Sequence, residues 1–505
     1  MKSFTRFLPS TALALVILAP AARADLTGAE VWEDWKGYFE AMGYEVSGSE
    51  SQTGDTLSVS DVAIVMNLPE DDSRFEMTWE KLTFTDVGDG SVKIGLPGTM
   101  PIAIDTMSRT DESWNIRLDF TQTGLDMSAA GESGDITYSY SADTVATELA
   151  SVTVDGETMP EGDVAGRLAF AGLSGSTAVK VGAMREIRQT AKAEQLDYLI
   201  RLLGPEGATA NASGTSQGID LTSNLAIPLE AVDPNDPAAM LANGFAVDSA
   251  ISFGANSGEF ATTGPEGAIR GTTTSQGGEL AVDMGSAGLA YSMVQNALQM
   301  AMTADATPLP IAFELGEFAT KLLMPLTESD DPQDFALTAS LVDLKVSEAI
   351  WMLFDPQGKL PRDPATAEID LTGKMRVTSD LLDPALDVQP ELGSGQAGNV
   401  DSVTLNALRL DLAGAELTGS GQVDFDNSQP MAGPVPEGSV DLKLSGGNGL
   451  LDNLVAMGIL PDDQAMGARM MLGLFGVPTG EPDTLTSKIE FRKDGQILAN
   501  GQRIK

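Results

Sequence analysis

The chain offers few side chains that could carry out chemistry, because none of its 505 residues is a cysteine or a histidine. Ser-His-Asp and Cys-His catalysis are therefore excluded, and so is metal ligation by imidazole or thiolate. Carboxylates, lysine, tyrosine, serine and threonine remain. With 73 acidic residues in the chain, pairs of carboxylates arise by chance and identify no site. We therefore expect a non-enzymatic protein with no catalytic residue, no cofactor and no metal ligand.

Two acidic stretches resemble fragments of calcium-binding loops, Asp86–Gly90 (DVGDG) and Asp424–Asn427 (DFDN). Neither continues to the glutamate at the twelfth position that a complete EF-hand loop requires. We interpret both as turns, and the acidic excess as a source of solubility.

The first residues indicate export. A basic start is followed by the apolar stretch Leu8–Pro20 and by Ala22-Arg23-Ala24, an A-x-A cleavage pattern. This order is typical of a secretory signal peptide, which we place at residues 1–24, with the mature chain beginning near Asp25. No cysteine follows for lipid attachment, and no later stretch holds 18 consecutive apolar residues. We expect a bacterial periplasmic protein without a stable transmembrane anchor after signal cleavage.

The formal net charge of −43 falls to about −46 without Lys2, Arg6 and Arg23 of the signal peptide. Such a surface repels phosphate backbones and anionic headgroups, so we expect no nucleic-acid partner. The densest basic run interrupts this pattern and comprises Lys180, Arg185, Arg188, Lys192 and Arg201. Its members are expected to pair with neighbouring carboxylates. The functional alternative is a cradle for an anionic headgroup.

Alternation of apolar and polar residues dominates the rest of the chain. In Leu408–Asp426, leucines alternate with Arg409 and Asp411 before an Ala413–Glu416 corner, and apolar residues and glycines alternate with polar residues after it. Similar runs, separated by Gly, Asp and Asn, predict well over a dozen strands joined by hairpins. The predicted fold is mainly β (a β-rich α+β class), a large twisted antiparallel sheet. We expect residues 25–505 to form a single elongated β-rich region, with two structural halves meeting near 230–245 as a further option.

Helices are fewer than strands in this prediction. An amphipathic N-terminal helix is predicted at 28–42, and shorter ones at 236–244 and 347–354. A C-terminal pair at 449–457 and 461–475 is rich in Leu and Met. It is expected to cover one end of the sheet, or alternatively to move and admit a ligand. The stretches 185–203 and 288–303 fit both helix and strand, and their fold stays open at this level.

The C-terminal third carries a resemblance. The segments 351–373 (WMLFDPQGKLPRDPATAEIDLTG), 441–460 (DLKLSGGNGLLDNLVAMGIL) and 489–505 (IEFRKDGQILANGQRIK) resemble the alphaproteobacterial family DUF2125, over nearly the whole mature chain. The family implies no activity, so no site residue is carried over. The closing strand is also similar to that of YdgA-type and, more distantly, AsmA-like proteins. That likeness implies lipid handling, although this chain lacks the persistent N-terminal anchor of AsmA-like proteins.

Most predicted strands have one apolar face, and the predicted helices are too few to cover all of these faces. Two functions from different classes are compatible with this arrangement. The first is binding or handling of a lipid or other apolar cargo in envelope maintenance. A 14-carbon chain offers on the order of 10 kcal/mol at about 0.8 kcal/mol per buried CH₂, before association costs. The second is a structural or assembly role with an envelope protein partner, in which two sheets enclose a dry core without a ligand. The sequence names no ligand-binding residue for either.

Overall fold

A computed structural model describes residues 25–68, 73–107, 112–160, 162–204, 207–229, 236–379, 381–382, 398–428 and 433–505. The predicted signal peptide at 1–24 lies outside these ranges. The structure is 67% strand and 12% helix, which confirms the mainly β prediction.

The helices coincide with the predicted ones to within about two residues. They are α1 (Gly28–Ala41), α2 (Pro237–Ala242), α3 (Glu348–Phe354), α4 (Gly447–Ala456) and α5 (Asp462–Phe475).

The strands of the N-terminal half are β1 (Glu45–Thr53), β2 (Thr56–Leu68), β3 (Ser73–Asp86), β4 (Ser91–Gly95), β5 (Thr99–Met107), β6 (Ser113–Thr123), β7 (Asp126–Glu132), β8 (Asp135–Val154), β9 (Glu157–Thr158), β10 (Ala165–Val181), β11 (Met184–Leu203) and β12 (Thr209–Pro228). Those of the C-terminal half are β13 (Ala246–Phe253), β14 (Asn256–Gly264), β15 (Gly267–Ser275), β16 (Gly277–Gly285), β17 (Gly288–Ala304), β18 (Thr307–Met324), β19 (Gln333–Val346), β20 (Ala365–Val377), β21 (Gly398–Leu412), β22 (Ala415–Asp426), β23 (Val435–Ser445), β24 (Val477–Pro478), β25 (Thr484–Phe491), β26 (Ile497–Ala499) and β27 (Gln502–Arg503).

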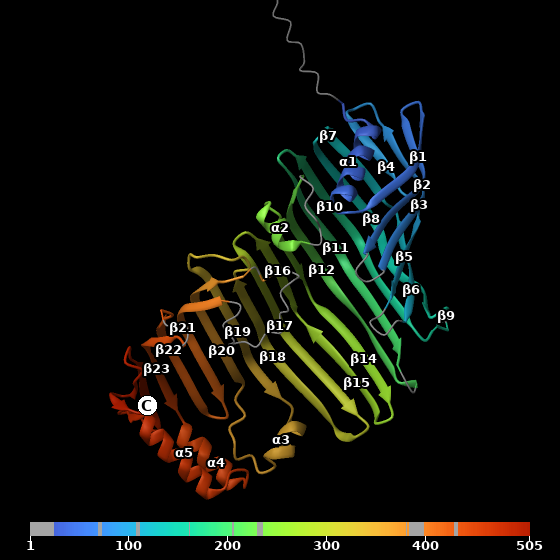
Figure 1. Cartoon of the computed structure of the whole chain (residues 1–505). Coiled ribbons are helices and arrows are strands. Elements are labelled where there is room, and N and C mark those ends of the chain that lie inside the picture. Colours follow the sequence, from blue (N-terminus) through green and yellow to red (C-terminus); the bar gives the residue numbers. More distant parts are fainter. Residues whose placement is uncertain are drawn as a thin grey trace, which may run out of the picture.

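All of these strands belong to one continuous antiparallel sheet, which forms a long curved band from the N-terminal to the C-terminal end (Figure 1). The two ambiguous stretches are both strands, because 185–203 lies in β11 and 288–303 in β17. Each is paired along most of its length on both sides, β11 with β10 and β12, and β17 with β15, β16 and β18. A helix at either position would satisfy its own backbone but would leave the facing edges of the neighbouring strands unpaired, whereas a strand satisfies both.

A topology of six strands occurs twice along the sheet. Between the long strands β3 and β8, the sheet divides into two shorter pairs, β4 with β7 and β5 with β6. Between β12 and β17 it divides in the same way, into β13 with β16 and β14 with β15. The chain order within the two units is identical, so β3–β8 and β12–β17 are an internal structural repeat.

A transverse line of backbone kinks crosses the sheet at the middle of its long strands. On β11 the inward-facing residues are Ala191 and Ala193 and then, three positions later, Leu196, so the alternation gains one extra residue there. Neighbouring strands carry the extra residue at the same level, which preserves their register. Left-handed backbone, which bends a strand, occurs along this line at Asp61, Gly172, Gly218, Ala297 and Asp343.

The well-buried core lies at the N-terminal end, under α1. A Thr27–Glu30 capping box starts the helix, which buries Val31 and Trp32 against the sheet. Trp35 packs edge-on to Phe84, with 5.5 Å between ring centroids. Within the described ranges, the one large cluster of buried apolar side chains falls between residues 26 and 179. Among the described residues, no comparable cluster covers the rest of the sheet.

Candidate functional site

The inner face of the curved sheet is an apolar surface that we call the trough. Its members are fixed by register, since residues directly opposite each other on antiparallel strands lie on the same face. Tyr138 and Ile187, which pack under α1, define the inner face at one end. Following the pairs from there across β8 and β10–β23, Arg185 is the one charged residue at an inner position of the described strands.

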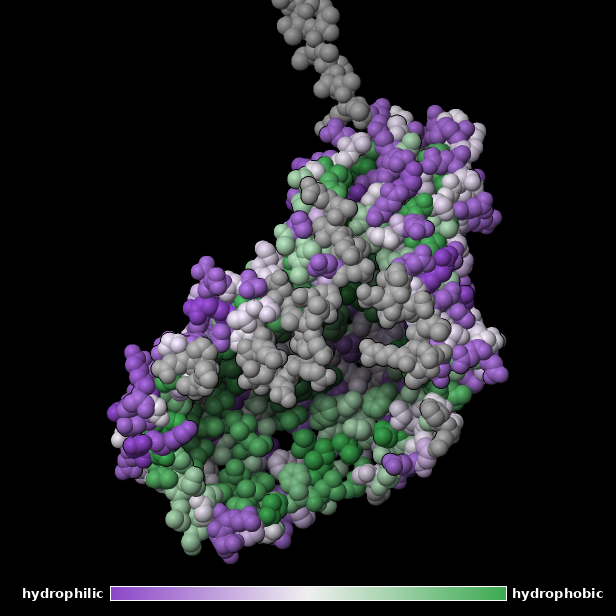
Figure 2. All heavy atoms as spheres, in the orientation of Figure 1, coloured by the Kyte–Doolittle hydropathy of each residue, from purple (hydrophilic) through white to green (hydrophobic). Residues whose placement is uncertain are grey.

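Many inner side chains of the trough are open to solvent. Leu337 on β19 is 39% exposed and Leu410 on β21 is 43% exposed. Figure 2 shows apolar residues gathered in a hollow in the lower half of the molecule, where Figure 1 places β17–β22, with hydrophilic residues along the borders. Contiguous exposed apolar surface on this scale marks a binding surface rather than an ordinary exterior.

Aromatic rings cover glycines along the floor of the trough. A Cβ added at Gly271 on β15 would lie 2.4 Å from the ring of Phe260 on β14, and one at Gly373 on β20 would lie 2.4 Å from the ring of Phe335 on β19. The glycines are therefore needed for each ring to lie against the neighbouring strand. Each ring covers backbone of the neighbouring strand where glycine has no side chain.

The C-terminal helices close the far end of the trough. Leu472 and Phe475 of α5 face Leu444 and Leu485 across a cavity of about 350 Å³. Other apolar side chains of α5 are exposed, namely Met466, Met470 and Leu474, and so are Met352, Leu353 and Phe354 of α3, which packs near β18. The predicted cover is present, and its outer side is rich in methionine, a flexible side chain that suits varied apolar contacts.

A second cavity, of about 470 Å³, lies beneath α1 at the opposite end of the trough. Trp35, Tyr38 and Phe39 of α1 form one wall. The sheet supplies the remainder, which comprises Met77, Trp79, Leu96, Met100, Ile102, Phe120, Met127, Tyr138, Tyr140, Thr177, Val179, Arg185, Ile187 and Gln189. We call it the α1 cavity. Its volume falls in the range of small-molecule sites, about 300–1,000 Å³.

A buried ion pair lies in this wall. Arg185 of β11 donates to the Asp34 carboxylate of α1 at 2.5 Å, and the two side chains are only 5% and 8% exposed. The Tyr138 hydroxyl donates to the other carboxylate oxygen at 2.7 Å, and the guanidinium lies over the Tyr38 ring. Burial raises the pKa of Tyr138 well above its usual value, and the Asp34 charge raises it further. Tyr138 therefore stays a protonated donor that helps hold α1 on the sheet.

Two hydrogen-bond donors in the lining of the α1 cavity have no partner. They are the indole Nε1 of Trp79 and the guanidinium Nε of Arg185, both buried. A buried donor without an acceptor costs about 1–3 kcal/mol. Both atoms are enclosed by the surrounding protein, although their side chains contribute to the wall of the cavity.

The basic run around Arg185 does not form an exposed cradle. Arg188 pairs with Glu186 and Lys192 with Asp220, as Arg185 does with Asp34, so the expected pairing is confirmed for these three. Arg201 donates from Nε to the Asn211 side chain at 3.1 Å.

Of the two stretches interpreted as turns, Asp86–Gly90 leads from the end of β3 into a turn, whereas the interpretation of Asp424–Asn427 was wrong, because its first three residues belong to β22. In the β3–β4 connection, Asp89 accepts hydrogen bonds from the backbone and hydroxyl of Ser91, and Asp86 accepts one from the backbone of Gly28. Asp424 lies within β22, while Asp426 accepts a bond from the backbone of Ser428 beyond that strand. No group of three or more acidic residues in the described ranges is arranged to hold a metal ion.

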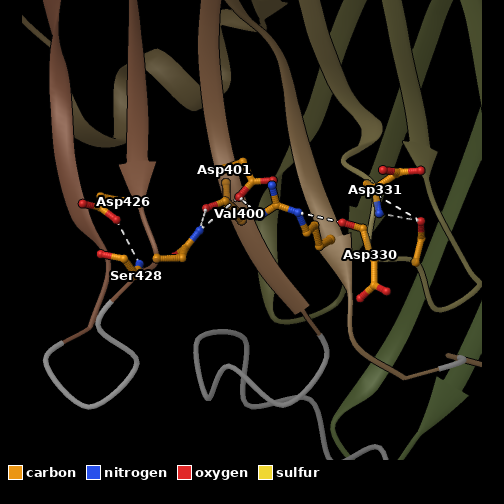
Figure 3. A network of polar contacts seen from close by, with 9 residues as sticks. Asp330, Asp331, Val400, Asp401, Asp426 and Ser428 are labelled. Atoms are coloured by element: carbon orange, nitrogen blue, oxygen red, sulfur yellow. Dashed lines mark hydrogen bonds and ion pairs between the residues drawn. The ribbon is translucent and has the colours of Figure 1, made fainter.

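A network of polar side chains lies at the rim of the trough, beside the stretch Asp424–Asn427 (Figure 3). Arg376 donates to the Asp401 carboxylate at 2.7 Å and to the backbone oxygen of Asp330 at 3.0 Å. Asn427 donates to the backbone oxygen of Val400 and to Asp401. The network joins the ends of β20, β21 and β22 to the 329–331 loop, so these acidic residues have a structural role.

A protein-family model matches part of the chain. The family model described as an uncharacterized protein conserved in bacteria (DUF2125) matches residues 242–502. The chain belongs to the DUF2125 family. The match begins at the end of α2 and covers β13–β27, a narrower span than the near-complete resemblance expected from the sequence. The chain matches no curated protein and no solved structure, so the YdgA-type and AsmA-like likeness stays a prediction.

Residues 355–364, within the first of the three segments that resemble DUF2125, form a loop between α3 and β20. Asp355, which is fully buried, accepts hydrogen bonds from the backbone of Lys359 and Leu360 at 2.9 Å each. Pro361 then lies against Gly414 in the two-residue turn of the β21–β22 hairpin. This loop therefore joins α3 to the lower rim of the trough.

Two further features of this DUF2125 protein were not recognised in the sequence. Gly214–Gly218 matches the G-x-S-x-G pattern of hydrolases, but Ser216 lies inside β12, paired with Leu196 and Asn256, and not on the strand-to-helix turn that exposes a nucleophile. A hollow of about 680 Å³ is lined mainly by outer-face residues, including Arg201, Glu259 and Arg270. None of its lining residues has a buried side-chain donor without a partner, in contrast to the α1 cavity.

Proposed function

We propose that this DUF2125 protein is exported to the bacterial periplasm, where it binds lipid acyl chains against the trough and carries out no catalysis. The observation that carries the proposal is the concave apolar face, which no described helix covers over most of its length and which carries one charged residue on the described strands β8 and β10–β23. Hydrocarbon needs no specific polar partner, so a flat apolar floor is sufficient to bind it.

The size of the trough supports lipid as the occupant. At about 4.8 Å per strand, the run from β8 to β23 measures on the order of 60 Å along the curve. The hydrocarbon core of a bilayer is about 30 Å thick, so one acyl chain occupies about 15 Å. The trough is several chain lengths long. A single 14-carbon chain would contribute on the order of 10 kcal/mol of burial before association costs.

The proposal is tested by purifying the protein from the periplasm, denaturing it and measuring extracted lipid by mass spectrometry. We expect lipid at one or more molecules per chain, and a mature N-terminus near Asp25. Lipid-free protein at its native mass would contradict lipid binding and favour the structural or assembly role.

A matched pair of variants locates the binding surface. Leu410→Glu places a carboxylate on the inner face of β21, where lipid would remove water from it, and should reduce bound lipid at least about tenfold. Thr418→Glu adds the same charge to the outer face of the same hairpin, opposite Arg409 and Lys443, and should leave the lipid content unchanged. Equal losses in both variants would refute binding in the trough.

A further inference from the structure

Exposed apolar side chains are concentrated at one edge of the sheet. This edge is formed by the start of β10, the end of β11, the turns of the β14–β15, β17–β18 and β21–β22 hairpins, and the helices α3 and α5 (Figure 1). Its strands expose Leu168, Ile200, Leu202, Ile269 and Leu309, each by at least 40%. We call these side chains, together with the exposed apolar ones of α3 and α5, the apolar edge.

The register of the strands makes the apolar edge continuous with the trough. Leu202 lies opposite Ala210, Ala210 lies opposite Thr262, and Thr262 lies opposite Ile269, so these residues form one row across four strands. Ile200 lies two residues further in on the same face. All of them are inner-face residues, and the trough therefore opens directly at this edge.

The opposite edge of the sheet has a different character. The ion pair of Arg376 with Asp401 lies there, within the polar network at the ends of β20–β22. Among the described residues, the large apolar side chains exposed at that edge are Val181, Leu229 and Val400. Exposed apolar surface that is concentrated on one side of a molecule marks a contact surface.

Charged side chains of both signs lie beside the apolar edge. Arg201 and Arg270 are neighbours of Leu202 and Ile269 in sequence, point to the outer face and line the outer hollow. They are the two arginines of the described strands β10–β23 without an ion pair, since the others each pair with a carboxylate. Glu259 lines the same hollow and also has no ion pair among the described residues. Free guanidinium groups suit phosphate, and a free carboxylate suits an ammonium group.

A zwitterionic bilayer fits this edge better than a second copy of the chain or an anionic membrane. Two copies would bring together chains of net charge −43. Glu266 and Asp305 lie in the turns of the β14–β15 and β17–β18 hairpins, where they would face an anionic surface. At about 4.8 Å per strand, the strand ends from β10 to β23 extend on the order of 50 Å along the curve, which is enough to contact many lipids at once.

We infer that the apolar edge docks on the surface of a zwitterionic phospholipid bilayer, with its leucine and methionine side chains among the acyl chains and Arg201 and Arg270 at the headgroup phosphates. Interfacial binding combines apolar side chains that reach hydrocarbon with charged ones that stay at headgroup level. The inference goes beyond the proposed function, because docking does not require lipid in the trough. Where both hold, an acyl chain passes from the membrane onto the inner face at Leu202 and Ile269.

The test is flotation of the mature full-length protein with vesicles of phosphatidylcholine and phosphatidylethanolamine in equal parts. We expect the protein to float with the vesicles and the double variant Leu353→Glu/Met470→Glu to bind at least about tenfold more weakly. Full burial of even one leucine or methionine side chain corresponds to at least about tenfold in affinity. Leu353 is 62% exposed and Met470 71% exposed, so the variant should keep the wild-type unfolding midpoint.

The matched control is Val181→Glu/Leu229→Glu, which adds the same two charges at the opposite edge and should leave flotation unchanged. Equal losses in the two double variants, or a wild-type protein that does not float, would overturn the inference. A vesicle-free dimer that Leu353→Glu/Met470→Glu dissociates would overturn it too, because a second copy would then occupy the edge.

The headgroup contact has its own pair of variants. Arg201→Gln/Arg270→Gln should weaken flotation about threefold or more. Lys180→Gln/Lys321→Gln removes the same charge near the opposite edge, at the ends of β10 and β18, and should not weaken it. Vesicles that contain phosphatidylglycerol should bind no more tightly than zwitterionic ones at low salt. Tighter binding to them, or equal effects of the two charge variants, would refute this contact.

Docking and lipid binding in the trough fail separately. A short-chain phospholipid below its critical micelle concentration reaches the trough without a membrane, so Leu353→Glu/Met470→Glu should bind it like wild type and Leu410→Glu should not. If the wild-type protein binds this lipid but does not float, the trough function stands and the docking inference fails. If the protein floats but binds no lipid, the trough function fails and docking stands.

Discussion

The ion pair between Asp34 and Arg185 should be the largest single electrostatic contribution to holding α1 on the sheet. Both side chains are more than 90% buried, with 2.5 Å between the bonded nitrogen and oxygen. Two unit charges about 4 Å apart interact by about 4 kcal/mol at an effective dielectric constant of about 20. Removing one partner leaves the other as a buried, unpaired charge. We therefore expect Asp34→Ala and Arg185→Ala each to destabilise the protein by about 3–5 kcal/mol.

The double variant, in which both Asp34 and Arg185 are replaced by alanine, measures the interaction energy between the two side chains. When both charges are removed together, no unpaired charge remains, so the double variant should lose much less than the sum of the single losses, with a coupling energy of about 2–3 kcal/mol. Urea unfolding followed by tryptophan fluorescence measures this, since Trp32, Trp35 and Trp79 lie in the same N-terminal core. Mass spectrometry of the purified variants checks that bound lipid does not differ between them.

An exposed ion pair supplies the control. Arg167 and Glu148 lie 2.6 Å apart on β10 and β8, with side chains 46% and 50% exposed. Solvent screening limits such a pair to about 0.2–1 kcal/mol, so its double-mutant cycle should show weak coupling. Additive effects of Asp34→Ala and Arg185→Ala, within about 0.5 kcal/mol, would refute the assignment of a strong buried pair.

Three further predictions follow from other parts of the fold. Gly271→Ala should destabilise the protein by about 1–3 kcal/mol, because the new methyl group displaces the Phe260 ring, while Gly264→Ala in the same hairpin meets nothing and should be near neutral in thermal unfolding. Asp355→Ala should leave two backbone N–H groups unpaired and speed amide exchange at Lys359 and Leu360, an effect that Asp363→Ala on the exposed loop should not reproduce. Burial alone would raise the pKa of Asp483, but hydrogen bonds from the start of α4 outweigh burial and lower it. The stabilisation by the Asp483 carboxylate is therefore complete above the unfolded pKa of about 3.9 and is lost as pH falls through the folded pKa. The difference in unfolding free energy between wild type and Asp483→Asn should close below about pH 4, and a constant difference down to about pH 2 would contradict this.

Strands with a strong apolar alternation were predictable from the sequence. In Leu408–Asp426 the alternation and the Ala-Gly turn set both strands and their register, and the structure pairs Leu410 with Leu417 as that pattern requires. β14 and β15 were not predicted, because Thr, Ser and Gly occupy many of their inner and outer positions and give no clear period. The extra residue at the transverse kinks also breaks the alternation within long strands such as β11.

The α1 cavity could not be predicted from the sequence for a different reason. Asp34 and Arg185 are 151 residues apart, and their contact depends on the curvature of the sheet between β3 and β11. A composition with 73 acidic residues offers many equivalent partners for any arginine. One feature of the sequence did indicate a buried position for Arg185. On a strand, Arg185 lies on the same face as the apolar residue Ile187.

The distribution of charge also limits what can occupy the trough. On the described strands β8 and β10–β23 the acidic residues occupy outer positions, and Arg185 is the single charged residue on the inner face. Two copies that met trough to trough would bring together rims that belong to chains of net charge −43, and their repulsion would oppose that dimer at low ionic strength. An anionic headgroup at the rim would meet the same field. An uncharged lipid meets neither cost. Raising the salt concentration should therefore leave neutral-lipid affinity nearly constant while it strengthens binding of anionic lipids, and a neutral-lipid affinity that fell steeply with salt would contradict a purely apolar contact.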